Sequence, residues 1–217
     1  MRTLGGILAQ WFVAVASLYG GVEQAIAEPR SVSIIFVRHA EADTSLPGQP
    51  LSGIGRQRVE LLAPSLQNVK FTHVFATHTL RARQTVEGIA TAHGLPVAQL
   101  PAPGSLLDGQ PVDEATPRAA AIEPLAAALK GLPPGSVALV ALNSENFFAI
   151  LNRLGVAVAA AGKSCSPGSM CVPCADNSCF PRDQYDQLWH MVREPGRNRP
   201  QALIELRYGA GWRIARS

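Results

Sequence analysis

Residues 31–41 read SVSIIFVRHAE, a run rich in β-branched apolar residues that ends in an arginine, a histidine and a nearby glutamate. Such a run predicts a strand that is buried on both faces, as in a parallel sheet covered by helices. Arg38 and His39 follow directly at the C-terminal end of this strand. Because open parallel sheets bind ligands beyond the C-terminal ends of their strands, these two residues are the first candidates for a functional site.

The rest of the chain alternates between strand-like and helix-like segments. Further strands are predicted at 71–76, 95–100, 137–142, 187–192 and 202–208, helices at 52–67, 80–93, 115–130 and 146–154, and a loop at 101–118. This alternation predicts an α/β domain of three layers, α/β/α, with a mostly parallel central sheet. Thr77-His78 and Asn143-Ser144 also follow strands, so we expect three polar clusters at one edge of the sheet.

Three motifs lie in order on the expected elements. Residues 38–41 (RHAE) follow the first strand, residues 51–57 (LSGIGRQ) open the first helix, and residues 77–85 (THTLRARQT) open the second. This ordered set resembles the histidine phosphatase superfamily, the phosphoglycerate mutase-like proteins, over about residues 32–155. The resemblance implies a phosphoglycerate mutase-like fold. An isolated Arg-His pair would be weak evidence, whereas the ordered set is specific.

The resemblance implies phosphoryl transfer through a phosphohistidine. Arg38 and Arg81 would each grip phosphoryl oxygens with a planar guanidinium. His39 would attack phosphorus in line through a neutral ring nitrogen. A carboxylic acid would protonate the leaving oxygen and then activate water. Since the arginines neutralise the phosphoryl charge in this scheme, we expect neither a metal nor a cofactor.

The sequence departs from the family pattern at the second histidine, which the family carries after a later strand. Residues 137–155 read VALVALNSENFFAILNRLG, so Asn143 stands in the histidine position and Ser144 follows it. Both residues are predicted to contact phosphate, but an asparagine donates only neutral hydrogen bonds. Losing one preorganised donor of this kind costs about 10²–10³ in rate, so we expect reduced activity. His78 could in principle replace the lost charge.

The motifs do not identify the carboxylic acid. Asp108, Asp113 and Glu114 lie in the predicted loop before the third helix, where the family often carries its carboxylate. Glu145, two residues after Asn143, is another candidate. Asp108 is preferred because it lies in a glycine-containing bend that could turn inward. The predicted catalytic residues are therefore His39 and Asp108.

Composition fits one globular domain that binds a small anion. Hydrophobic residues make up 47% of the 217 residues and charged residues 16%, so the chain can bury a core. The net charge is +3, and no dense Lys/Arg run is present. We therefore expect no nucleic acid as a partner. The resemblance implies a small phosphorylated substrate or phosphate instead.

The N-terminal residues 1–27 have the pattern of a secretory signal peptide. Arg2 precedes an apolar run over residues 4–18, and the small-x-small triplet Ala25-Ile26-Ala27 supplies a cleavage site. The alternative is an uncleaved membrane anchor. Cleavage would leave a domain of residues 28–217 in the periplasm or outside the cell, without stable membrane insertion.

All four cysteines lie in a cysteine-rich loop at residues 163–181, as Cys165, Cys171, Cys174 and Cys179. In an exported protein disulfides are the default expectation, and four cysteines allow three pairings. Zinc held by four thiolates is the alternative, because two of the cysteines have C-x-x-C spacing.

Two functions from different classes follow. The first is an exported phosphomonoester hydrolase that works through a phosphohistidine at His39, with reduced activity because of Asn143. The second is a catalytically inactive domain that binds a phosphorylated ligand. A thiol redox protein built on Cys171 and Cys174 is a weaker third hypothesis, since these residues lack the strand-to-helix setting that lowers a thiol pKa.

Overall fold

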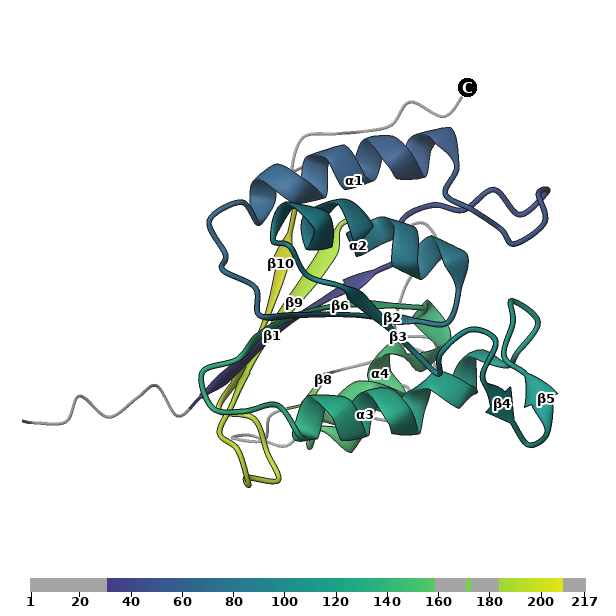
Figure 1. Cartoon of the computed structure of the whole chain (residues 1–217). Coiled ribbons are helices and arrows are strands. Elements are labelled where there is room, and N and C mark those ends of the chain that lie inside the picture. Colours follow the sequence, from purple (N-terminus) through teal and green to yellow (C-terminus); the bar gives the residue numbers. More distant parts are fainter. Residues whose placement is uncertain (1–30, 159–170, 173–183, 209–217) are drawn as a thin grey trace, which may run out of the picture.

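The computed structural model describes residues 31–158, 171–172 and 184–208. A six-stranded sheet lies at its centre (Figure 1). The strands in spatial order are β10 (Ala202–Arg207), β9 (Gln187–Arg193), β1 (Val32–Arg38), β6 (Val137–Leu142), β2 (His73–Thr77) and β3 (Val97–Leu100). β1, β6, β2 and β3 are parallel to one another, and β9 is antiparallel to both of its neighbours. The predicted α/β fold with a mostly parallel sheet is confirmed.

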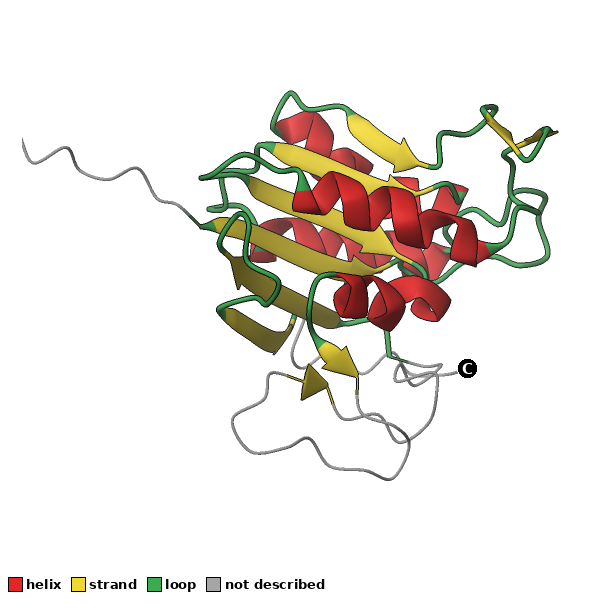
Figure 2. Ribbon diagram, turned by 90° about the horizontal axis from the view of Figure 1, so that it is seen from below, coloured by secondary structure: helices red, strands yellow, loops and turns green. Residues whose placement is uncertain are grey.

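Helices cover both faces of the sheet. α1 (Gly53–Ser65) and α2 (Leu80–Ala92) lie on one face, and α3 (Ile122–Lys130) and α4 (Ser144–Arg153) lie on the other (Figures 1 and 2). Ser52 caps α1 as expected, since its side chain accepts a hydrogen bond from the backbone N–H of Gly55. The three predicted layers are therefore present.

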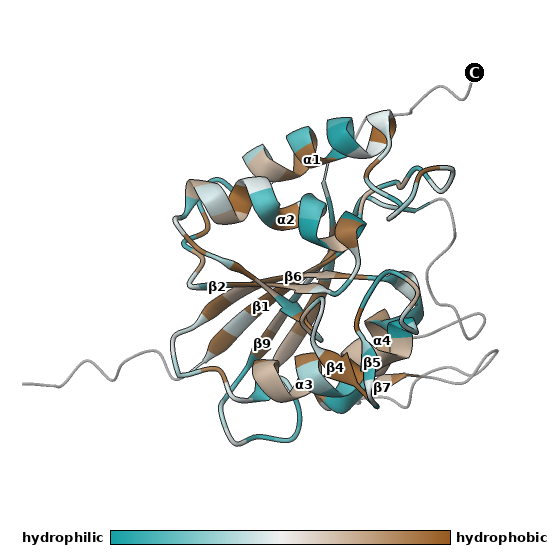
Figure 3. Cartoon of the chain, turned by 45° about the vertical axis from the view of Figure 1, so that its right-hand side comes forward, coloured by the Kyte–Doolittle hydropathy of each residue, from teal (hydrophilic) through white to brown (hydrophobic). Residues whose placement is uncertain are grey.

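Each face of the sheet has its own core. Along β1, Ile34 and Phe36 pack toward α3 and α4, whereas Ile35 and Val37 pack toward α1 and α2. Successive side chains of a strand point to opposite faces, so a strand between two helical layers must be apolar at every position. Figure 3 shows the same pattern, with largely hydrophobic strands under helices that carry hydrophilic residues. The uninterrupted apolar run of β1 thus results from burial on both sides.

The third helix begins later than the sequence predicts. Residues 115–117 are not helical, and a short 3-10 helix, η1 (Arg118–Ala121), precedes α3. Pro117 disfavours helical backbone at the residue before it. The Asp113 side chain also accepts hydrogen bonds from the backbone N–H groups of Ala115 and Thr116, which stabilises a turn there. The turn leaves Glu114 and Arg118 next to the C-terminal edge of the sheet. α4, by contrast, begins two residues earlier than predicted.

Within the predicted loop at 101–118, a short hairpin pairs β4 (Leu106–Leu107) with β5 (Gln110–Pro111). β7 (Ala157–Val158) pairs with β8 (Cys171–Val172) in a second small sheet. The predicted signal peptide lies outside the described residues, as does most of the cysteine-rich loop. Among the residues that the structure describes, no helix has both the length and the apolar character needed to cross a membrane.

Candidate active site

Three neighbouring parallel strands deliver the predicted site residues to one edge of the sheet. β6 lies between β1 and β2, so the residues that follow these strands meet. The backbone N–H of His39 donates to the carbonyl of Leu142 at 2.9 Å, which ties the end of β1 to the end of β6. The Thr77 hydroxyl donates to Oδ1 of Asn143 at 2.7 Å, which ties β2 to β6. The polar clusters expected at three strand ends therefore form one connected group.

His39 is held as a neutral imidazole with its Nε2 lone pair facing Arg81. Its Nδ1 lies 2.8 Å from the carbonyl of Ala40, and because a carbonyl can only accept, Nδ1 carries the hydrogen. Nε2 accepts from Nε of Arg81 at 3.3 Å. Burial, with the ring only 7% exposed, and the charges of Arg81, Arg38 and Arg118 lower the pKa of His39 to about 3. The ring nitrogen that faces the arginine is thus unprotonated at neutral pH.

The motif residues around His39 fix the loop that follows it. Thr85 accepts a hydrogen bond from the backbone N–H of Ala40 at 3.0 Å, and Gln84 accepts one from Leu51 at 2.8 Å. A Cβ on Gly55 would lie 2.1 Å from the carbonyl oxygen of Glu41, so α1 can approach this loop only with a glycine there. The Gln-Thr pair and the glycine therefore position the nucleophile loop rather than contact phosphate.

Arg38 lies on the side of His39 that faces β9. Its Nη1 donates to the backbone carbonyl of Gln184 at 2.9 Å, and its guanidinium lies 4.0 Å from the ring centroid of Tyr185. The Tyr185 ring is also 6.1 Å from the His39 ring, centroid to centroid. No motif marks Tyr185, because it precedes an otherwise unremarkable strand.

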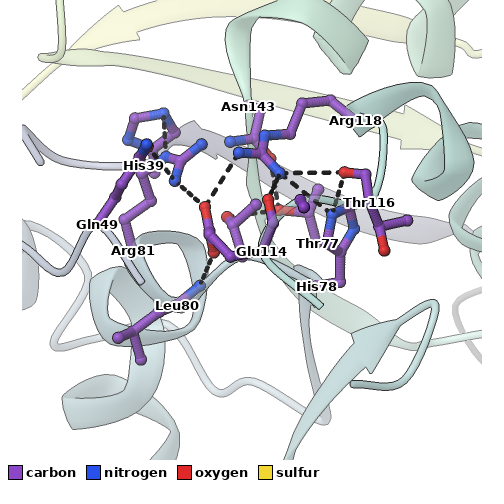
Figure 4. Close-up of polar contacts among 12 residues, drawn as sticks. His39, Gln49, Thr77, His78, Leu80, Arg81, Glu114, Thr116, Arg118 and Asn143 are labelled. Atoms are coloured by element: carbon purple, nitrogen blue, oxygen red, sulfur yellow. Dashed lines mark hydrogen bonds and ion pairs between the residues drawn. The ribbon is translucent and has the colours of Figure 1, made fainter. Parts of the chain in front are cut away.

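Arg81 and Glu114 form an ion pair beside His39 (Figure 4). Nη1 of Arg81 contacts Oε1 of Glu114, and Nη1 also donates to the Gln49 side chain at 3.2 Å. Oε2 of Glu114 accepts from the backbone N–H of Leu80, at the start of α2, at 3.2 Å. The arrangement brings an imidazole, a guanidinium and a carboxylate together at one strand end.

The structure does not bring Asp108, the predicted acid, to this site, whereas Glu114 lies there beside Arg81. Asp108 and Gly109 form the tip of the β4–β5 hairpin, with φ of 51° and 78°. Positive φ at both central residues is typical of a two-residue hairpin turn, and Asp-Gly is a preferred sequence for it. Asp108 is exposed at this tip, and the hairpin extends away from the sheet (Figure 1).

The other proposed carboxylates also have separate contacts. The Asp113 side chain binds backbone N–H groups within its own turn. Glu145 is exposed and accepts from the Ser144 hydroxyl at 3.2 Å. Ser144 was predicted to bind phosphate, but in this structure its hydroxyl is directed to Glu145.

Asn143 lies at the site but contacts neither His39 nor Arg81 directly. It is fully buried, and among the described residues its Nδ2 has no hydrogen-bond partner. Its backbone N–H donates to Oδ1 of Asn146 at 3.1 Å. The structure thus places a neutral donor, the Asn143 amide, at the C-terminal end of β6.

Arg118 is the site residue that the sequence did not reveal. Its Nη2 lies 3.0 Å from Oε1 of Glu114, on the carboxylate oxygen that Arg81 also contacts. Its Nη1 donates to the backbone carbonyls of Glu114 at 2.8 Å and Thr116 at 3.2 Å. The predicted helix over 115–130 concealed this residue as an ordinary helix-surface arginine. The Pro117 beside it was the available signal that the helix begins later.

His78 does not supply the missing charge. Its Nε2 lies 3.0 Å from the carbonyl of Thr116 and 3.3 Å from Nη1 of Arg118, while its Nδ1 is buried without a partner among the described residues. Burial, and to a smaller extent the nearby charge of Arg118, lower the pKa of His78. The lowered pKa favours the neutral ring, which cannot carry the charge of the second histidine.

Within residues 31–158, 171–172 and 184–208, no group of three or more His, Cys, Asp or Glu side chains is placed to hold a metal ion. The site's charges come instead from three arginines and one carboxylate.

Comparisons with known proteins agree with the fold and the motifs. Residues 34–102 match the model of the histidine phosphatase superfamily, branch 1. A proposed alpha-ribazole-5'-P phosphatase from Escherichia coli has a similar structure, with a TM-score of 0.53 and 16% identity over 81% of this chain and 96% of that chain. A mycobacterial glucosyl-3-phosphoglycerate phosphatase gives a TM-score of 0.49 and 15% identity over 75% of this chain and 91% of that chain. No curated protein matches the sequence significantly. Over residues 34–102, which carry all three ordered motifs in full, the chain is similar to branch 1 of the histidine phosphatase superfamily.

Proposed function

We propose that the protein is a phosphomonoester hydrolase that transfers a phosphoryl group to Nε2 of His39 and then to water. The observation that carries this proposal is the contact of 3.3 Å between Arg81 and the unprotonated Nε2, beside the carboxylate of Glu114. A lone pair, a guanidinium and a carboxyl group at one strand end are the parts that in-line phosphoryl transfer needs.

Binding begins with an exchange of anions. His39 is nearly buried, and Glu114 is paired with Arg81 next to it, so a phosphoryl group reaches Nε2 by displacing the carboxylate from Arg81. Arg81 then holds phosphoryl oxygens that carry the developing charge. Arg38 stabilises the site from the opposite side of the ring. The displaced Glu114 stays within reach through the backbone N–H of Leu80.

The reaction follows in two balanced steps. Glu114, once displaced from Arg81, takes up a proton from solvent. Nε2 of His39 attacks phosphorus, the bond from phosphorus to the ester oxygen breaks, and Glu114 gives this proton to the leaving alkoxide. The Ala40 carbonyl, which accepts from Nδ1, stabilises the positive charge on the phosphorylated ring. Glu114 then takes a proton from water as its oxygen attacks phosphorus. The bond from phosphorus to nitrogen breaks, and phosphate leaves with His39 neutral and Glu114 again protonated.

A phosphate-binding protein without turnover is the second candidate, and two observations favour it. His39 is only 7% exposed, and Asn143 carries no charge in the position of the second histidine. If the protein is a hydrolase, Asn143 lowers its rate unless another cation takes the place of the second histidine.

Release of inorganic phosphate from a panel of phosphomonoesters, in the presence of a chelator, separates the two candidates. We expect the purified protein to release phosphate, His39→Ala to abolish release, and His93→Ala, a histidine that packs on Phe71 at the other end of α2, to retain it. Equal phosphate release by wild type and His39→Ala would overturn the hydrolase. Thermal stabilisation by phosphate without any release would favour the binding protein.

Export to the periplasm or outside the cell remains a proposal that rests on residues 1–27. Expression of the full chain in a secreting host should yield a product that begins at Glu28. A product that retains Met1 in the membrane fraction would support the anchor instead.

A further inference from the structure

We propose that Arg118 is a third phosphoryl-binding residue and supplies the positive charge that Asn143 cannot, because it shares one carboxylate oxygen with Arg81 beside the position of the missing histidine. This inference rests on the proposed function, since it names a further ligand of the same phosphoryl group. It also changes the expectation for activity, because the loss of the second histidine is then largely compensated.

The geometry of Glu114 shows where an anion would bind. Nη1 of Arg81 and Nη2 of Arg118 both contact Oε1 of this carboxylate, which lies between the two guanidinium groups (Figure 4). A phosphoryl oxygen that takes the place of Oε1 would therefore meet both arginines at once. Arginine forks that converge on one oxyanion are the arrangement that favours phosphate over a monovalent carboxylate.

The charge balance of the cluster points the same way. Arg81 and Arg118 share the carboxylate of Glu114 beside a neutral His39. A phosphomonoester dianion in the place of this carboxylate would neutralise both guanidinium charges. Burial and the charge of Arg81 lower the pKa of Arg118, so a bound dianion would favour its charged form.

The turn that lost the histidine also holds Arg118 in place. The Asn146 side chain accepts from the backbone N–H of Asn143 at 3.1 Å and donates to the backbone carbonyl of Arg118 at 3.2 Å. Nη1 of Arg118 is further fixed by the carbonyls of Glu114 and Thr116. A donor held in advance of binding contributes more to catalysis than one that must be ordered during the reaction. The unpartnered Nδ2 of Asn143 is a second, neutral donor at the same turn.

A purely structural role for Arg118 makes different predictions. The two backbone carbonyls bind Nη1, whereas Glu114 binds Nη2, so the arginine could serve only to stabilise the turn before η1. In that case its removal would lower the melting temperature and leave phosphate affinity nearly unchanged. A phosphoryl ligand would instead lose affinity and rate in a fold of similar stability.

The test combines Arg118→Ala, Arg118→Lys, Asn143→His and the double variant Arg118→Ala/Asn143→His, with Arg153→Ala as the matched control. Arg153 is an exposed arginine paired with Glu123 on the last turn of α4, away from the site. For each protein we would measure kcat and KM with p-nitrophenyl phosphate, the affinity for inorganic phosphate by calorimetry, and the melting temperature.

We expect Arg118→Ala to lower kcat/KM about 100-fold, which is the loss expected for one preorganised donor. We expect it to weaken phosphate binding at least about tenfold, while Arg118→Lys recovers part of both losses. Asn143→His should raise the kcat/KM of Arg118→Ala at least about tenfold, and that of wild type by a smaller factor, because the charge is already present there. Arg153→Ala should resemble wild type throughout.

The outcomes separate this inference from the proposed function. If no phosphomonoester is hydrolysed but Arg118→Ala still loses phosphate affinity, the hydrolase fails and the inference stands. If the protein is an active hydrolase and Arg118→Ala keeps wild-type kcat/KM and phosphate affinity, the inference fails and the hydrolase stands. A large gain from Asn143→His in the wild-type background would also overturn it, since the charge would then have been missing.

Discussion

The two halves of the site are built in different ways. The half formed by β1 and α2 presents His39 and Arg81 from short motifs, in which each residue has a local task, such as the hydrogen bond from Ala40 to Thr85. The half formed by β6, α4 and η1 joins Asn143 to Arg118 through Asn146, across 25 positions of the chain. On our proposal, the nucleophile stays in a recognisable motif while the positive charge opposite to it comes from another element, η1.

The largest expected effect tests the first half. Arg81→Ala removes the guanidinium that contacts both His39 and Glu114, so we expect kcat/KM to fall by at least about 10³. Arg83→Ala is the matched control, because Arg83 lies two residues along α2 and pairs only with exposed Glu87. Steady-state kinetics with p-nitrophenyl phosphate check both variants. Similar losses in the two variants would show that Arg81 acts only through helix stability.

The next largest effect tests Glu114, which pairs with Arg81 from one half of the site and Arg118 from the other. Glu114→Gln removes the acid and base, and we expect a loss of about 10²–10⁴ in kcat/KM for alkyl phosphates. The loss should be smaller for the step that releases p-nitrophenol, which needs no proton. Asp108→Asn, at the hairpin tip, should leave both rates unchanged. A loss in Asp108→Asn without one in Glu114→Gln would restore Asp108 as the acid.

A smaller effect concerns pH. The pKa of His39 is about 3 in the folded chain, whereas the ordinary pKa of a histidine is 6.5. Between these pH values the unfolded chain therefore binds a proton that the folded chain does not. The free energy of unfolding therefore decreases as pH falls from 6.5 toward 3, by at most about 1.4 kcal/mol per pH unit from this residue. Urea unfolding of wild type and His39→Gln at pH 4.5 and pH 7 would measure it as a shallower dependence in the variant. Parallel dependences would contradict the lowered pKa.

The same comparison explains what the sequence could predict. Periodicity revealed the sheet and the layers, because a strand buried on both faces must be apolar at every position, as in β1. His39, Arg81 and the helix cap at Ser52 were also evident, since their contacts are local or belong to a known motif. These predictions needed no knowledge of how distant segments pack.

Asp108 and Arg118 were misjudged for one physical reason. Whether a residue in the segment between β3 and α3 faces the site depends on turns within that segment. Asp108 and Gly109 form a hairpin tip outside the site. Because Pro117 delays the start of the helix, Glu114 and Arg118 lie at the site. The sequence predicted a loop and then a helix in this segment, but it did not predict which side of the chain the hairpin at Asp108 and the turn at Glu114 would face.

The central claim is that Nε2 of His39 carries the phosphoryl group during turnover. Glu114→Gln offers the most direct test, because p-nitrophenol leaves without an acid, whereas attack by water on the intermediate lacks its base. After an alkaline quench with p-nitrophenyl phosphate, mass spectrometry of the peptide should find about one phosphoryl group per chain on His39, and none in His39→Ala/Glu114→Gln. Phosphoryl transfer to another residue, or turnover by wild type with no phosphohistidine in either protein, would contradict the account.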